Sequence, residues 1–171
     1  MKALIVIDMQ KDFIDGALGT EEAVEIVPNV RKKIVEYHKN GDTVIFTRDT
    51  HHEDYLTTHE GKYLPVTHCI KGTEGWEIDK TVDVERFIHI DKTSFGFTGW
   101  NHVFDGENVE SIEIVGLCTD ICVISNALIL RALFPEIEIV VDSSCCAGVT
   151  KETHKAALDV MKCCHIKVTG E

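Results

Sequence analysis

The sequence contains few positive charges. Its 171 residues include 17 Lys and Arg against 29 Asp and Glu, which gives a formal net charge of −12. Nucleic acids and anionic membranes are recognised through a basic footprint, and this acidic balance does not supply one. We therefore expect a small-molecule ligand, with no nucleic acid and no membrane as partner.

Long hydrophobic runs and prolines are also scarce. No segment approaches the roughly 18–20 apolar residues of a membrane-spanning helix, and the chain has only three prolines. The N-terminal MKALIVID leads directly into a strand pattern, without the apolar region and cleavage site of a secretory signal. The hydrophobic content of 44% is that of an ordinary globular protein, so we expect one cytoplasmic domain over residues 1–171.

Cysteine is plentiful, but the pattern lacks two common signatures. Seven is an odd number in a chain without a secretory signal, so we expect no disulfide framework. The segment VGLCTDICVISN places Cys118 and Cys122 four residues apart, which is not the redox spacing CxxC. We interpret two adjacent pairs as small buried residues, because neighbours on a strand or helix point in different directions. These pairs are Cys145–Cys146 and Cys163–Cys164.

Short β-branched segments alternate with helical patterns along the chain. The predicted strands are Lys2–Ile7, Asp42–Thr47, Arg86–Ile90, Ser111–Leu117, Glu136–Val141 and the weaker His165–Val168. The predicted helices are Val27–Lys39, Cys122–Phe134 and Thr150–Cys163. This alternation predicts an α/β fold: a three-layer, Rossmann-like arrangement with a central, mostly parallel six-stranded sheet flanked by helices. The second helix is apolar nearly all round, which favours a homo-oligomer.

Reactive side chains follow four of the predicted strands. Asp8, Asp49 and Lys92 follow the first three, and the turn 117–122 follows the fourth. An acid in such a place is often only a helix cap. In an open parallel sheet, however, the ligand crevice lies beyond the carboxyl ends of the strands. Here the strands deliver two acids, a cation and a thiol to the same edge.

The turn after the fourth strand favours Cys122 as the reactive thiol. Thr119 and Asp120 are good N-cap types, which places Cys122 in the first turn of a helix. Free backbone N–H groups and the helix dipole favour a thiolate there, so we expect Cys122 to be acidic. Cys118 falls at the tail of the strand, and the two thiols do not share a helix face.

The segment 48–69 concentrates acids and histidines. Its members are Asp49, His51, His52, His59, Glu60 and His68. The pattern Asp-x-His with a distant His supplies mixed oxygen and nitrogen ligands for a divalent zinc, iron or manganese ion. The alternative is a polar lid whose histidines only form hydrogen bonds.

These stretches together resemble a known family. IVIDMQKDF around Asp8, DKTSFGF around Lys92 and VGLCTDICV around Cys122 occur in this order and are similar to the cysteine hydrolases of the isochorismatase-like superfamily. The closest resemblance is to the nicotinamidase branch, and it covers essentially the whole chain. It implies a metal-assisted cysteine amidohydrolase that converts nicotinamide to nicotinate and ammonia through a thioester on Cys122.

The resemblance also implies roles for individual residues. Cys122 matches the nucleophile, Asp8 the acid that takes its proton, and Lys92 the cation that positions and stabilises both. A non-proline cis peptide is implied between Leu117 and Cys118. It would direct the backbone N–H groups of Cys118 and Cys122 into an oxyanion hole.

The implied metal ligands are Asp49, His51 and His68, with Glu60 as the additional ligand and His59 as its alternative. We expect the ion to be zinc, with iron and manganese as alternatives.

The substrate ring requires a flat apolar slot. Phe13 matches a family aromatic in that slot, and Phe95, Phe97 or Trp100 would supply the opposite wall. The tryptophan that many nicotinamidases carry before the last metal histidine is absent, and Pro65 lies in that vicinity. A related cysteine hydrolase of a carbamoyl amide or ureide is therefore an alternative. A non-catalytic redox or metal-binding module is an alternative of another class.

Overall fold

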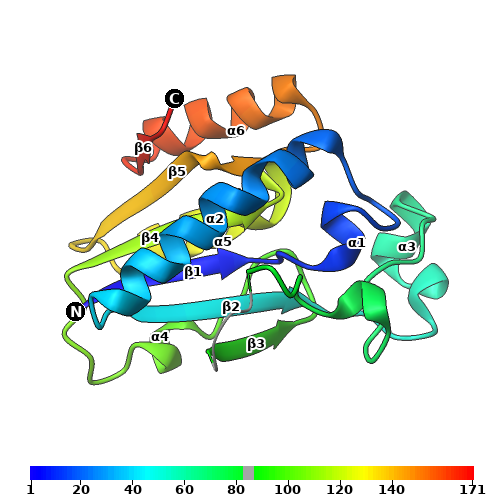
Figure 1. Cartoon of the computed structure of the whole chain (residues 1–171), viewed down its shortest axis with the longest axis horizontal. Helices are drawn as coiled ribbons and strands as arrows, with labels where there is room; N and C mark the ends of the chain where they lie inside the picture. The colour runs from blue at the N-terminus through cyan, green and yellow to red at the C-terminus, as the bar shows by residue number, and fades with distance from the viewer. Residues whose placement is uncertain (83–86) are drawn as a thin grey trace.

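The computed structural model describes residues 1–82 and 87–171. Its centre is a six-stranded sheet in the order β3-β2-β1-β4-β5-β6, and every neighbouring pair is parallel (Figure 1). The strands are β1 (Lys2–Ile7), β2 (Thr43–Asp49), β3 (Ile88–Lys92), β4 (Ser111–Leu117), β5 (Glu138–Ala147) and β6 (Lys167–Thr169). The sheet confirms the predicted α/β fold class.

Helices cover both faces of the sheet. The α-helices are α1 (Lys11–Ile14), α2 (Glu21–Lys39), α3 (His59–Tyr63), α4 (Trp100–Val103), α5 (Ile124–Leu133) and α6 (Lys151–Cys163). Two 3-10 turns, η1 (Tyr55–Thr57) and η2 (Glu74–Trp76), and a π-helical turn, η3 (Thr119–Val123), complete the elements. No helix in the described ranges combines the length and the apolar character that crossing a bilayer requires.

The central strand shows why the layers form. Successive side chains of β1 point to opposite faces, since the side-chain period of a strand is two. Ile5 and Ile7 pack with α4, α5 and α6, while Leu4 and Val6 pack with α1 and α2. Figure 1 shows α2 crossing the face of Leu4 and Val6 in front of the sheet, with α5 behind the sheet. Burial on both sides explains the unbroken apolar run of this strand.

Two strands end later than their apolar patterns predict. The predictions for β1 and β4 are confirmed, but β2 and β3 each continue two residues, so that Asp49 and Lys92 are their last residues. The register pairs Asp49 directly with Lys92. Backbone pairing continues through polar positions, which an apolar pattern does not record. Arg86, where the third strand was predicted to begin, lies outside the described residues.

Other boundaries also differ from the predictions. The fifth strand runs to Ala147, because its last residues pair with β4 after a register shift at Gly116. The first long helix begins at Glu21 instead of Val27, since the Thr20 side chain accepts a hydrogen bond from the third helical N–H and caps it.

The adjacent cysteine pairs divide between core and surface. Cys145 and Cys146 are buried as predicted, whereas Cys163 and Cys164 are exposed, so that prediction was wrong. The second pair lies at the end of α6, whose buried face is carried by other residues. These residues are Ala157, Leu158 and Met161.

Gly116 allows β4 to approach β1 immediately before the site. Its φ is +116°, and an added Cβ would lie 2.1 Å from the carbonyl oxygen of Ile7. We expect Gly116→Ala to destabilise the fold by about 3 kcal/mol, through backbone strain and overpacking. Gly41→Ala is the control, because Gly41 has φ +74° and nothing within 4 Å. It should cost about 1 kcal/mol. Equal losses of unfolding free energy in urea titrations would show that the contact with Ile7 is unimportant.

Candidate functional site

A cavity of about 850 Å³ lies at the carboxyl ends of the strands. Its lining combines the end of β2, residues of α1 and α3, the segment after β3 and the turn after β4. Charged groups and a thiol are represented by Asp49, His51, Glu60, His68 and Cys122, and most of the remaining lining is apolar. The cavity therefore places polar chemistry inside an apolar enclosure, as small-molecule sites usually do.

Lys92 lies at the centre of a buried group of predicted catalytic residues. Its Nζ atom is 2.7 Å from Oδ2 of Asp8 and 3.5 Å from Sγ of Cys122. The same atom is 3.3 Å from Oδ1 of Asp49 and 3.2 Å from the carbonyl oxygen of Ser94. The side chains of Lys92 and Asp8 are 1% and 0% exposed. The structure thus brings the three residues together, and a single buried cation contacts all the others.

The charges in this group depend on burial and on one another. Burial disfavours the charged form of Lys92, but the carboxylates of Asp8 and Asp49 and the thiol of Cys122 outweigh it and keep the lysine pKa above its ordinary value. Burial raises the pKa of Asp8, and Lys92 opposes that shift only in part. The ammonium is therefore the permanent charge of the group, and Asp8 is suited to hold a proton.

The expectation of an acidic thiol was wrong for the free protein. Burial raises the pKa of Cys122 well above its usual range, and the neighbouring Asp8 carboxylate raises it further, against the effect of Lys92. A helix N-terminus does not compensate for the loss of water around a fully buried sulfur. The thiol therefore keeps its proton until a reaction partner arrives.

The turn that carries Cys122 differs from a capped α-helix. The peptide between Leu117 and Cys118 is cis, which confirms that prediction. Cys118, which precedes η3, has an extended backbone conformation, and no side chain caps the turn. The predicted caps were wrong, because Thr119 bonds to His154 and Asp120 accepts from the N–H of Val149. The backbone N–H groups of Cys118 and Cys122 stay predicted oxyanion donors.

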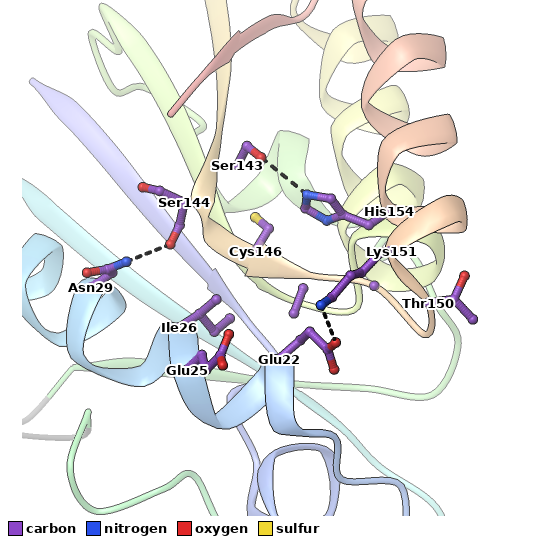
Figure 2. A pocket seen from close by; sticks show the side chains of 12 residues that line it. Glu22, Glu25, Ile26, Asn29, Ser143, Ser144, Cys146, Thr150, Lys151 and His154 are labelled. Carbon is purple, nitrogen blue, oxygen red and sulfur yellow. Dashed lines mark hydrogen bonds and ion pairs between the residues drawn. The ribbon is translucent and has the colours of Figure 1, made fainter. Parts of the chain in front are cut away.

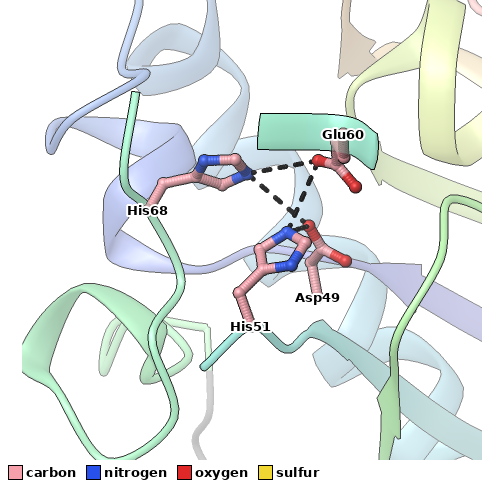
Figure 3. A group of neighbouring side chains, drawn as sticks. All are labelled: Asp49, His51, Glu60 and His68. Atoms are coloured by element: carbon pink, nitrogen blue, oxygen red, sulfur yellow. Dashed lines mark hydrogen bonds and ion pairs between the residues drawn. The ribbon is translucent and has the colours of Figure 1, made fainter. Parts of the chain in front are cut away.

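A second group of side chains converges beside the first (Figure 3). Nε2 of His51 lies 3.0 Å from Oδ2 of Asp49 and 3.4 Å from Oε1 of Glu60, and Nε2 of His68 lies 3.8 Å from each of these oxygens. The four ligand atoms all lie within 4.8 Å of one another. Bonds of 2.0–2.2 Å to one ion separate neighbouring ligand atoms by roughly 2.8–3.6 Å. The donor set and its spacing therefore fit a divalent metal ion.

The two histidines are prepared to bind a cation. Nδ1 of His68 lies 2.7 Å from the carbonyl oxygen of Val66, which can only accept, so Nδ1 carries the hydrogen and Nε2 presents a lone pair. Burial disfavours a charged His51, but hydrogen bonds to Asp49 and Glu60 outweigh it and raise the pKa of His51 to about 9. The negative charge of this group thus favours a cation, whether proton or metal.

Several supporting residues were missed by sequence reasoning. The amide of Gln10 donates to the carbonyl oxygen of Asp49 at 2.8 Å and accepts from the N–H of Asp49 at 2.7 Å. The buried ring of Tyr55 packs against His51 and His68, with centroid distances of 4.6 and 5.0 Å. Gln10 lies inside the motif IVIDMQKDF, and Tyr55 lies inside the segment 48–69 that concentrates acids and histidines. The signal available was a polar glutamine three residues after the first strand, beside Asp8.

The predicted aromatic residues divide between the cavity and the core. Phe13 and Phe95 line the cavity, and Phe95 is 43% exposed. Phe97 is not among the described lining residues, which corrects its predicted position. Asn126 binds the backbone of this segment, accepting from the N–H of Phe97 and donating to the carbonyl oxygen of Phe95. The ring of Phe97 packs on the buried Trp100 instead, with centroids 5.1 Å apart.

Comparison with known proteins identifies the family. The model of the isochorismatase domain matches residues 2–171. The chain belongs to the isochorismatase family. An isochorismatase family protein of Bacillus subtilis strain 168 is 31% identical over 92% of both chains. A nicotinamidase of Schizosaccharomyces pombe is 26% identical over 99% of this chain and 93% of the relative.

A solved structure shows the same isochorismatase fold. The pyrazinamidase of Pyrococcus horikoshii, crystallised in complex with zinc, superimposes with a TM-score of 0.87. Its sequence is 30% identical, and the match covers 99% of each chain.

Proposed function

We propose that this isochorismatase family protein is a metal-assisted, nicotinamidase-like amidase that hydrolyses a small aromatic amide through a thioester on Cys122. The observation that carries the proposal is the placement of Lys92, which contacts Asp8 and Cys122. Lys92 also contacts Asp49, which belongs to the neighbouring group of candidate metal ligands. The nicotinamidase of Schizosaccharomyces pombe and the pyrazinamidase of Pyrococcus horikoshii, to which the chain is similar, support the amide class.

The acylation step uses the buried thiol and its neighbouring acid. Sγ of Cys122 forms a bond to the amide carbonyl carbon while the thiol proton passes to Asp8. The carbonyl π electrons move to oxygen, where the N–H groups of Cys118 and Cys122 are the proposed donors, each worth about 3–4 kcal/mol. The C–N bond then breaks, and Asp8 gives its proton to the leaving ammonia.

Deacylation reverses these roles. A water molecule attacks the thioester carbon through its oxygen and gives a proton to Asp8. The C–S bond then breaks. The sulfur recovers the proton from Asp8, and the carboxylic acid leaves. Lys92 remains an ammonium throughout, so it balances the charge that appears alternately on the aspartate and the sulfur.

The candidate metal ligands Asp49, His51, Glu60 and His68 are proposed to hold a zinc ion. When bound, the ion would supply a Lewis acid for the ring nitrogen of the substrate. The zinc complex of the Pyrococcus horikoshii relative supports this assignment. Phe13 and Phe95 are the proposed walls for the substrate ring, because both line the cavity that contains Cys122.

A panel of amides with metal analysis tests the proposed function. The zinc-loaded protein should release ammonia from nicotinamide or pyrazinamide. Turnover restricted to a carbamoyl amide would favour the related hydrolase instead. No ammonia from any amide, together with a reversible Cys118–Cys122 disulfide, would favour the non-catalytic redox module.

The choice between Glu60 and His59 as metal ligand gives a separate prediction. We expect Glu60→Ala to weaken zinc binding by at least about 10–100-fold, since Glu60 belongs to the converging group. His59→Ala is the matched control. Its ring packs on Tyr63 with centroids 5.0 Å apart and is not part of that group. Competition with a chromophoric chelator measures both affinities, and a larger loss in His59→Ala would reverse the assignment.

We further propose a single cytoplasmic domain over residues 1–171 that forms a homo-oligomer. The family match over residues 2–171 supports the single domain. The apolar helix α5 supports association, because its Leu133 is 40% exposed. Light scattering of the purified protein measures the oligomeric state, and a monomer at working concentrations would refute it.

A further inference from the structure

The turn η3 is tied to α6 and β5 by a chain of hydrogen bonds. The buried hydroxyl of Thr119 lies 2.7 Å from Nδ1 of His154 on α6. Nε2 of the same ring lies 3.2 Å from the hydroxyl of Ser143 on β5. Figure 2 shows this histidine reaching from α6 toward β5. One imidazole therefore joins three elements that are distant in sequence.

A second set of contacts holds the same turn. The carboxylate of Asp120 accepts from the N–H of Val149, with both oxygens at 3.1–3.2 Å. Gly148, just before it, packs so closely on His154 that an added Cβ would lie 2.8 Å from the histidine Cβ. The two residues that open the turn are thus both anchored, Thr119 to α6 and Asp120 to the segment that links β5 to α6.

The described residues that line the cavity of Cys122 do not include His154. It lines a separate cavity of about 390 Å³ between α2, β5 and α6 (Figure 2). Its influence on the thiol must therefore pass through Thr119, which stands three residues before Cys122 in a single π-helical turn.

We propose that His154 is a positioning residue, which fixes the location of the Cys122 sulfur by holding the hydroxyl of Thr119. The inference rests on the proposed role of Cys122 as nucleophile. Burial lowers the pKa of His154, which favours a neutral ring at neutral pH. A neutral imidazole has one donor and one acceptor nitrogen, so in either tautomer one hydroxyl donates to it and the other accepts from it.

The position of the sulfur controls the bond-forming step. Sγ of Cys122 must lie near Asp8 and Lys92 and also face the substrate carbonyl. A misplacement of about 1 Å can reduce the rate of such a step about 10²-fold. Substrate binding depends on other residues of the cavity, so loss of the Thr119 contact should lower kcat and leave KM nearly unchanged.

Two amide substitutions at position 154 separate the contacts of the imidazole. The side chain of His154→Asn places a polar atom where Nδ1 was and retains a partner for Thr119. The longer side chain of His154→Gln places its polar atoms near the former Nε2 and retains a partner for Ser143 only. We expect the Gln variant to lose about 10²-fold in kcat with KM within about twofold, and the Asn variant to stay near wild type.

Substitutions of Thr119 provide the complementary test. Thr119→Ser keeps the hydroxyl and should retain kcat, whereas the isosteric Thr119→Val should match His154→Gln. The double variant Thr119→Val/His154→Gln should be no slower than either single variant, because all three remove the same contact. The assay is ammonia release by zinc-loaded protein, with thermal melts to confirm folding.

The outcomes distinguish this inference from the proposed function. Equal kcat for the Asn and Gln variants, additive losses in the double variant, or a rise in KM without a loss of kcat would each overturn the positioning role. An unmodified protein that releases no ammonia from any amide would refute the proposed function and with it the premise. If His154→Gln and Thr119→Val fail to fold, the conservative variants Thr119→Ser and His154→Asn remain for comparison with wild type. Loss of kcat in both of these folded proteins would also overturn the positioning role.

Discussion

Replacement of Cys122 by alanine should abolish ammonia release, whereas Cys118→Ala should retain it. Removal of a nucleophile of this kind lowers kcat at least about 10⁴-fold in comparable hydrolases. The two thiols line the same cavity, but Lys92 contacts only Cys122 among them in the described structure. Cys118 is proposed to act through its backbone N–H, which alanine preserves.

Thiol labelling provides the control for this pair of variants. Cys163 and Cys164 are exposed and would react with any alkylating reagent, so both should first be replaced by serine. In that background, substrate-protected labelling should map to Cys122 by peptide mass. Activity in Cys122→Ala together with its loss in Cys118→Ala would reverse the roles of the two residues.

Replacement of Lys92 by methionine should remove activity and also destabilise the fold. Met has a similar volume but leaves the buried carboxylate of Asp8 without its cation, which costs about 3–5 kcal/mol. The activity falls because no positive charge then balances the aspartate and the sulfur. Urea unfolding and the ammonia assay measure the two effects separately.

The loss of stability in Lys92→Met should depend on pH. Burial raises the pKa of Asp8 in the folded protein, and removal of Lys92 raises it further. At pH values between the pKa of an unfolded aspartate and this higher pKa, the folded variant binds more protons than the unfolded chain. Its stability therefore rises as the pH falls from 7 toward about 4. A deficit that is constant over this range would mean that Asp8 is not the unpaired charge.

A double variant isolates the ion pair. Lys92→Met/Asp8→Asn removes both charges, and Asp49 keeps its contact with His51. The double variant should recover most of the lost stability, since replacing both partners of a buried pair is often nearly neutral. It should nevertheless remain inactive. Additive losses of stability would indicate that Lys92 and Asp8 do not interact.

The patterns in the sequence predicted the layers and most of the site. Strand and helix periods come from local geometry, so β1 and β4 were predicted to the residue. Asp8, Lys92 and Cys122 were found because the carboxyl ends of parallel strands meet at one edge of the sheet. Backbone pairing beyond the apolar stretch, which extends β2 to Asp49, depends on a neighbouring strand and left no local pattern.

The supporting contacts could not be predicted, because each joins residues far apart in sequence. Gln10 binds the backbone of Asp49 across 39 positions, and Thr119 meets His154 across 35. The pKa of Cys122 was predicted in the wrong direction for a related reason. A helix terminus can be read from neighbouring residues, whereas complete burial of a thiol depends on the whole fold.

Asp49 belongs to both polar groups at once, with Oδ1 toward Lys92 and Oδ2 toward His51. This shared carboxylate makes the two groups thermodynamically linked, and linkage between binding free energies is reciprocal. A substitution that changes the cation affinity of the histidine side changes the strength of the lysine ion pair through the same atoms. The reactivity of the nucleophile group and the metal affinity of the histidine group consequently change together, and neither can be redesigned while the other is held constant.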